Sequence, residues 1–199
     1  KADGSHELRI FYRAFTSQAV YFIGWKNSLQ ANKQIWTQGQ GKDNSHWVPV
    51  VDHMGEKVEF DLSVLFETGY QVVANGILAE KLVEGPLTRW VFDMDHPMSS
   101  YLLAFAIGRF DALSWKSSSG VPLMGYYPKG ASEKARWTYR YTQELFEYLE
   151  KEIGIPYPWG DYKQVPVRDF LYAGMENTGA TFFSDRYLVD SLEYNDGNY

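Results

Sequence analysis

The residues best suited to chemistry stand together near the end of the chain, from Tyr172 to Asn177. Ala173 and Gly174 leave the backbone almost uncovered, so another chain can approach it closely. Glu176 then places a carboxylate beside that bare backbone. An uncovered strand edge with a nearby carboxylate can receive an extended peptide by strand addition and pair with its ammonium end. The same residues are also compatible with a bulge or turn that carries a solvated Glu.

Strand-like runs flank this stretch, Tyr162 to Val167 before it and Thr181 to Val189 after it. Further upstream, the spacing of apolar residues predicts one helix from Ser132 to Ile153, ended by Gly154. The residues on its apolar face, which we predict to be core, are Ala135, Thr138, Tyr139, Thr142, Leu145, Phe146, Leu149 and Ile153. A sheet and a helix must therefore position the candidate site.

Short strands punctuated by turns account for the first 110 residues. The predicted strands are Leu8–Tyr12, Val20–Trp25, Ile35–Gln40, Lys57–Phe66, Tyr70–Ala74, Arg89–Phe92 and Tyr101–Phe110. Asn75-Gly76 predicts a tight turn. The predicted fold class is mostly β with an α+β part. An antiparallel β-sandwich covers residues 1–110, and a second domain over residues 111–199 opens with a strand at Val121 to Tyr127.

Composition excludes several classes of partner. The 199 residues carry a net charge of -6, with no basic cluster, which argues against nucleic acid. No apolar run of about 18 residues predicts a membrane span. The chain contains no Cys, so its redox compartment stays open. We find no signal peptide at the start, and both a cytoplasmic protein and an exported protein with its signal removed are compatible with that.

The segment from Ala173 to Asn177 resembles the Gly-x-Met-Glu-Asn exopeptidase motif of the gluzincin zinc aminopeptidases, the peptidases of family M1. Ala173 departs from the Gly that the family usually places first. Five further segments resemble the same family in the same order: Trp36–Gln40, Val48–Asp52, Lys57–Leu62, Pro97–Leu102 and Gly154–Pro158. Several ordered matches are far more specific than one pentapeptide.

The resemblance implies a fold and an activity. It implies the later part of the family's β-sandwich, followed by the sheet and helix that open a thermolysin-like catalytic domain, in a protein that removes N-terminal residues from peptides. The family's zinc ligands lie downstream of its motif, but no His follows His96 in this sequence. We therefore expect a fragment that binds no zinc and is inactive alone, from a full-length parent that carries the zinc.

The resemblance also implies roles for individual residues. Glu176 would bind the substrate ammonium, Gln40 would accept a hydrogen bond from it, and Asn177 would orient Glu176 or its loop. The complete set of expected substrate-binding residues is Gln40, Tyr172, Ala173, Gly174, Met175, Glu176 and Asn177. The expected partners are peptides with a free N-terminus, and the fragment is expected to self-associate through apolar faces left uncovered.

Two other interpretations remain open at this point. A non-catalytic relative could keep the fold as a scaffold or binding module. A β-sandwich could instead bind a carbohydrate or a protein through a row of exposed aromatic side chains, because aromatics make up 17% of the chain. That last interpretation requires Trp25, Trp36 and Trp47 to lie at the surface.

Overall fold

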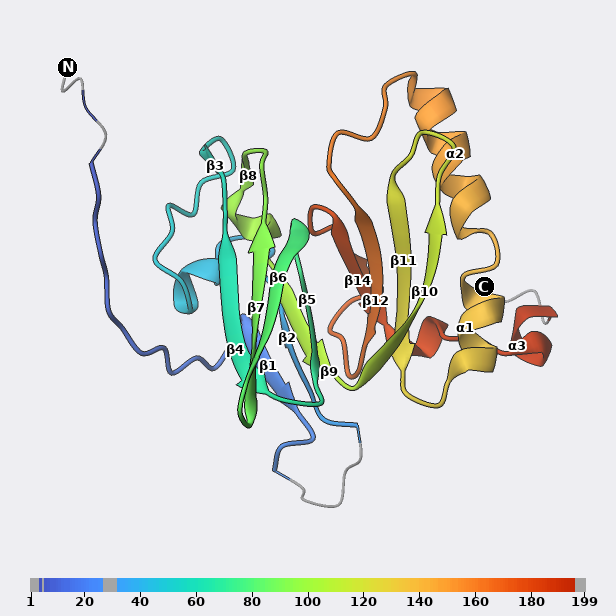
Figure 1. The fold of residues 1–199 in the computed structure, drawn as a ribbon, viewed down its shortest axis with the longest axis horizontal. Coiled ribbons are helices and arrows are strands. Elements are labelled where there is room, and N and C mark those ends of the chain that lie inside the picture. The colour runs from blue at the N-terminus through green and yellow to red at the C-terminus, as the bar shows by residue number, and fades with distance from the viewer. Residues whose placement is uncertain (1–3, 5, 27–31, 196–199) are drawn as a thin grey trace.

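Two groups of β-sheets lie side by side, and helices flank the second group (Figure 1). The computed structural model describes residues 4, 6–26 and 32–195. Strands β1 to β9 form the first group, and β10 to β14 form the second. This mostly β architecture, with an antiparallel sandwich followed by a sheet and helices, confirms the predicted fold class.

The first group is a β-sandwich. Its inner sheet has the order β1 (Val20–Ile23), β2 (Gln34–Thr37), β9 (Phe105–Gly108) and β5 (Gln71–Ala74). Its outer sheet has the order β4 (Leu62–Glu67), β7 (Leu87–Asp93) and β6 (Ile77–Glu84), and β3 (Lys57–Val58) pairs with β8 (Met98–Ser99). The two sheets bury one apolar core that includes Ile35, Val72, Trp90 and Phe92. Short 3-10 turns lie at Asp43–His46 and Ser100–Leu102.

The second group is one five-stranded mixed sheet with helices on one face. Its order is β10 (Phe110–Lys116), β11 (Pro122–Pro128), β12 (Tyr162–Val167), β14 (Ala180–Ser184) and β13 (Gly174–Met175). The strand β12 runs parallel to both its neighbours, whereas β10 and β13 are antiparallel edges. The helices are α1 (Ser132–Thr138), α2 (Thr142–Ile153) and α3 (Ser191–Asn195), with a 3-10 turn at Asp185–Tyr187.

The inner sheet of the sandwich packs directly on the five-stranded sheet. The shared core contains side chains from both, and its largest fully buried member is Trp36 of β2. Val165, Val167 and Phe182 contribute from the five-stranded sheet. Because strand side chains alternate between faces, Phe183 packs instead toward α1. The inner sheet is therefore buried on both faces.

Four predicted strands need correction. The run from Thr181 to Val189 is a strand only as far as Ser184, where a 3-10 turn begins. Leu8–Tyr12 lies outside any strand and exposes Leu8 and Phe11, because alternation alone supplies no partner. Lys57–Phe66 is two strands, because β3 pairs with β8 while β4 joins the outer sheet. Tyr101–Phe110 begins in a 3-10 turn and crosses from the inner sheet into β10. The predicted domain boundary at residue 110 stays a prediction, and it falls at this crossing.

The single predicted helix is also wrong, since the chain forms α1 and α2 with a turn between them. Tyr139 sits in that turn, 1% exposed, and its hydroxyl donates to the Tyr126 carbonyl at 2.5 Å. This anchor holds α1 against β11. Part of the predicted core face is exposed in α2, where Leu145, Leu149 and Ile153 are all more than half accessible.

The exposed aromatic row required by the carbohydrate-binding interpretation is not supported. Trp36 is fully buried, and Trp25 and Trp47 are half-buried. Trp25 contacts Phe66, with ring centroids 6.0 Å apart, and Trp47 contacts Phe105 at 5.4 Å. Trp25 and Trp47 therefore serve packing within the sandwich, and Trp36 serves packing between the two groups of sheets.

Two glycines of the five-stranded sheet give a matched test of packing. An added Cβ at Gly125 would lie 2.6 Å from the Tyr139 ring, whereas one at Gly174 would meet nothing nearer than 3.5 Å. We expect Gly125→Ala to lower the free energy of unfolding by about 1–3 kcal/mol through overpacking. We expect Gly174→Ala to change it by less than about 0.5 kcal/mol. Urea unfolding of the 199-residue chain measures both, and equal effects would contradict this packing.

Candidate functional site

The motif resembling an exopeptidase signature forms the outermost strand of the five-stranded sheet. Gly174 pairs with Phe183 and Met175 with Phe182 of β14. Just before the strand, the Ser184 amide donates to the Ala173 carbonyl at 3.0 Å. No described strand pairs with the other edge of β13. That edge can therefore accept an added extended chain.

The side chains of the motif alternate between solvent and core. Ala173, Gly174 and Glu176 are exposed, whereas Met175 and Asn177 are each 2% exposed. Met175 lies in the same core as Trp36, so its contacts in this structure are those of a packing residue. Its predicted role in a substrate pocket stays a prediction. Tyr172 is half exposed and its ring contacts Phe170, with centroids 6.5 Å apart.

The protein's own packing does not explain the glycine at position 174. Its backbone does not adopt positive φ, and an added Cβ would make only ordinary contacts with β14. The fold would therefore tolerate a side chain there. A bare backbone on an unpaired sheet edge is what close approach by a second chain requires.

The start of the motif loop is held by the sandwich. The Arg168 amide donates to Gln34 Oε1 at 2.8 Å, and the Arg168 carbonyl accepts from Trp36 Nε1 at 2.9 Å. The next residue, Asp169, adopts a left-handed conformation at φ 53°. Two side chains of β2 thus fix both backbone groups of the residue at which the chain leaves β12.

Gln40 lies beyond the end of β2 and is exposed. Its amide donates to Gln38 Oε1 at 2.8 Å, and Gln38 itself is 2% exposed. In the inner sheet, Trp36 of β2 pairs with Ala106 of β9, and Ala106 pairs on its other side with Val73 of β5. Gln40 therefore lies shortly after the strand that holds the start of the motif loop.

Several buried polar groups gather where the motif meets the sandwich. Within the described part of the chain, neither polar atom of the Asn177 side chain has a hydrogen-bond partner, and Gln38 Nε2 has none either. Asn75 and Lys163 are buried there too, at 2% exposure each. Our sequence reasoning missed Gln38, Asn75 and Lys163 as site-supporting residues. A lysine inside the apolar run of β12 was the one available signal, since buried lysines are rare unless paired.

The residues described here do not fit a zinc site. Across residues 4, 6–26 and 32–195, no three His, Cys, Asp or Glu side chains are grouped so that they could hold a metal ion. Among the same residues, no helix is long and apolar enough to cross a membrane.

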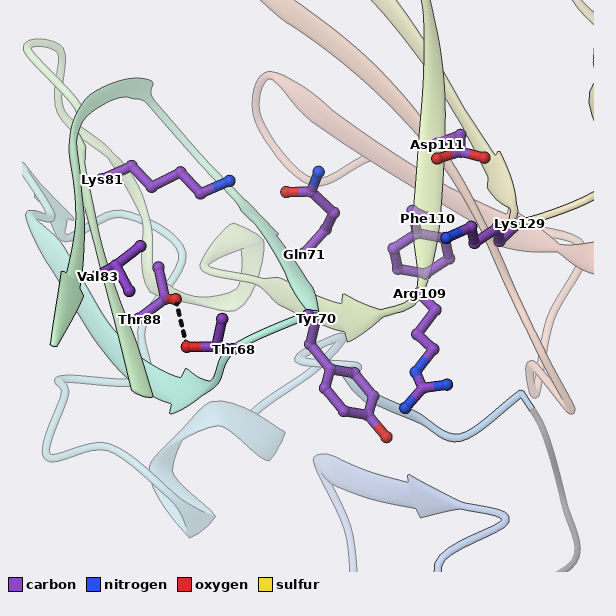
Figure 2. A pocket seen from close by; sticks show the side chains of 11 residues that line it. Thr68, Tyr70, Gln71, Lys81, Val83, Thr88, Arg109, Phe110, Asp111 and Lys129 are labelled. Carbon is purple, nitrogen blue, oxygen red and sulfur yellow. Dashed lines mark hydrogen bonds between the residues drawn. The ribbon is translucent and has the colours of Figure 1, made fainter. Parts of the chain in front are cut away.

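A separate pocket of about 480 Å³ lies between the outer sheet and the start of β10 (Figure 2). Lys81, Arg109 and Lys129 line it together with Asp111. The Lys81 ammonium lies 4.1 Å from the centre of the Trp90 ring, and the Arg109 guanidinium 5.3 Å from that of Tyr70. None of its lining residues belongs to the motif or its supports.

Comparisons with known proteins agree with this architecture. Residues 1–102 match the Peptidase M1 N-terminal domain, and residues 137–198 match the Peptidase family M1 domain. A leucyl aminopeptidase of Saccharolobus solfataricus is 27% identical over 83% of this chain and 21% of its own length. Human glutamyl aminopeptidase is 28% identical over 94% of this chain and 20% of its own length. The mouse glutamyl aminopeptidase is 31% identical over 72% of this chain and 15% of its own length.

The two family matches thus cover most of the β-sandwich and the part of the chain from α2 to α3. The chain belongs to peptidase family M1. It spans about a fifth of the length of the curated relatives it matches.

The absence of a grouped ligand set among the described residues generates a direct prediction. We expect the 199-residue chain to take up no stoichiometric zinc, because tight zinc sites need three or four converging ligands. We also expect it to release no amino acid from aminoacyl substrates. Metal analysis after dialysis against zinc, with a chromogenic aminoacyl assay, tests both. Uptake of one tightly held zinc per chain would contradict the prediction.

Proposed function

We propose that this chain is the part of a zinc-dependent aminopeptidase that binds the substrate's free N-terminus. The observation that carries the proposal is the placement of Glu176 and a bare backbone on an unpaired edge strand. Family membership and relatives named as aminopeptidases support it.

In this proposal a peptide lies along the free edge of β13 as an added strand. The Ala173 carbonyl already accepts from the Ser184 amide, so the backbone of Gly174 offers the peptide hydrogen bonds, and no side chain at position 174 stands in its way. The substrate ammonium pairs with the exposed carboxylate of Glu176. Gln40 accepts a further hydrogen bond from the same ammonium. Only the first residue of a chain carries that charge, so the pair selects chain ends.

The remaining motif residues have supporting roles. Asn177 adjoins Glu176 and orients it from a buried position, while Tyr172 forms part of the cleft wall. Met175 supports the strand from the core side. Zinc, in a full-length parent, supplies the activated water for hydrolysis.

The charge of Glu176 gives the sharpest test, in a protein of the relatives' length that contains this chain. Glu176→Gln keeps size and hydrogen bonding but removes the charge. A charged hydrogen bond contributes about 1.5–3 kcal/mol. We therefore expect kcat/KM for an aminoacyl substrate to fall about ten- to hundred-fold, because each ~1.4 kcal/mol is tenfold. Zinc content should not change.

Two matched measurements accompany that variant. A substrate with a blocked N-terminus has no charge to pair, so its turnover should be equally low in both proteins. Gln40→Ala should reduce kcat/KM less than Glu176→Gln, since the Gln40 side chain is neutral. Equal kcat/KM in wild type and Glu176→Gln would refute the proposal. A correctly folded protein with no peptidase activity at all would favour the non-catalytic scaffold.

The uncovered face of α2 predicts self-association of the 199-residue chain. A groove of about 690 Å³ runs along this face, lined by Leu145, Leu149 and Ile153 among others. Exposed apolar patches of this kind promote association. We expect sedimentation velocity to detect dimers or larger species at about 0.1 mM, and Leu149→Lys to reduce them at least several-fold. Leu192→Lys is the control, because Leu192 is 80% exposed and lies outside the groove. A chain that stays monomeric at that concentration would contradict the prediction.

A further inference from the structure

A tight turn of the sandwich is joined to the end of the motif by a buried amide. Asn75, at the first position of the Asn-Gly turn after β5, donates from Nδ2 to the Thr178 carbonyl at 2.7 Å. The same nitrogen donates to the Leu102 carbonyl at 2.9 Å, and Oδ1 accepts from the Ala104 amide at 2.6 Å. Thr178 directly follows Asn177, the last residue of the motif. One side chain of the sandwich therefore ties down the backbone at which the motif ends.

A second contact runs in the opposite direction across the same joint. The Lys163 ammonium, carried by β12, donates to the Gly76 carbonyl at 2.6 Å and forms a buried ion pair with Asp161. Its backbone amide donates to the Gly179 carbonyl at 2.9 Å. The sandwich thus contacts the motif's end through Asn75, and the motif sheet contacts the sandwich turn through Lys163. We call these four residues, Asn75, Gly76, Asp161 and Lys163, the clasp.

The clasp has little freedom to shift. Gly76 adopts φ 78°, and a Cβ there would clash with the Asp93 backbone. Ile77 packs closely on Gly160: an added Cβ at position 160 would overlap Ile77 Cδ1, so the Ile77 side chain would have to move. Burial lowers the pKa of Lys163 and raises that of Asp161, and each partner's charge opposes the shift of the other. A buried pair of this kind is costly to break, because one charge would be left without its partner.

Together with the contacts at Arg168, the clasp holds the motif loop at both of its ends. The loop begins at Arg168, where Gln34 and Trp36 hold both backbone groups, and it ends at Thr178, where Asn75 holds the carbonyl. Both anchors come from the inner sheet of the sandwich, whose strand β2 leads to Gln40. Between the anchors, β13 makes its only described ladder contacts with β14, at two residues.

We propose that Asn75, through its hydrogen bond to Thr178, and Lys163, through Gly76, are positioning residues that set where Glu176 stands relative to Gln40. This inference rests on the proposed function. It assigns to the sandwich a part in recognition of the substrate ammonium, since both groups that meet the ammonium are then placed by one rigid body. Asn75 and Lys163 themselves touch no substrate.

A protein in which the Glu176 carboxylate is misplaced by a fraction of an ångström still folds, but it binds the substrate less well. Loss of the Asn75 contact should therefore raise KM for substrates with a free N-terminus and leave kcat nearly unchanged. The effect should also disappear when Glu176 has no charge left to place. A residue that only stabilises the fold would lower the amount of active protein, which reduces apparent kcat and leaves KM as it was.

The test is a double-mutant cycle of Asn75→Ala with Glu176→Gln, in a protein of the relatives' length that contains this chain. Asn75 is chosen because removal of Lys163 would leave Asp161 as an unpaired buried charge. We expect Asn75→Ala alone to lower kcat/KM at least five-fold, mainly through KM. In the Glu176→Gln background we expect it to lower kcat/KM less than two-fold, because coupled residues are not additive. The same five-fold loss in both backgrounds would overturn the proposal.

Tyr139→Phe is the control for loss of stability. It removes one buried hydrogen bond between a side chain and the backbone, whereas Asn75→Ala removes three, and it lies in the contact between α1 and β11. It should lower thermal stability without raising KM. A KM increase in Tyr139→Phe equal to that in Asn75→Ala would mean that loss of stability alone causes the effect, and would overturn the proposal.

A milder variant covers the case in which Asn75→Ala does not fold. Ile77→Ala loosens the packing on Gly160 from a side chain that is 46% exposed, so it should fold. It should raise KM about two- to three-fold through the same Glu176-dependent route, and an unchanged KM would overturn the proposal. Failure of the proposed function gives a different result. In that case Glu176→Gln alone would have the same kcat/KM as wild type, whatever the clasp variants do.

Discussion

Burial of one apolar interface, between the inner sheet of the sandwich and the five-stranded sheet, holds the rest of this structure in place. Trp36 is fully buried at its centre, with Val73 from its own sheet and Val165 and Phe182 from the other. The area removed from water there stabilises the association but does not choose its alignment, because apolar contact is not directional. The inner sheet is buried on both faces, which explains why β2, β5 and β9 carry almost no exposed side chains.

Alignment is left to the polar groups at the interface. A buried donor or acceptor is costly unless it is paired, so each hydrogen bond admits only one relative placement of the two sheets. Gln34 and Trp36 fix the relative placement of the two sheets through their hydrogen bonds to the Arg168 backbone. The clasp fixes it through the hydrogen bonds to the carbonyls of Thr178 and Gly76. The open strand β13 lies between these anchors. This open sheet edge is therefore held at both ends by buried contacts with the sandwich.

The two faces of the motif have opposite requirements. Met175 and Asn177 turn inward, while Glu176 and the backbone of Gly174 turn outward. The period of two along a strand separates these tasks within a few residues. The same separation fails along α2, whose apolar face remains half exposed. Among the described residues, that face of α2 and the outer edge of β13 are both uncovered.

Local sequence determined much of this protein. Alternation and turn residues predicted β5, β12 and the Asn-Gly turn closely, Gly154 ended the helix in the left-handed conformation as expected, and the motif fell on a sheet edge. Alternation reports which face of a segment meets a core, but not which segment will pair with it. Only the tertiary structure therefore divided Lys57–Phe66 between two sheets and split the helix at Tyr139. Only the tertiary structure revealed that Gln38, Asn75 and Lys163 are buried. A hydrogen bond between residues distant in sequence produces no periodic pattern in the sequence.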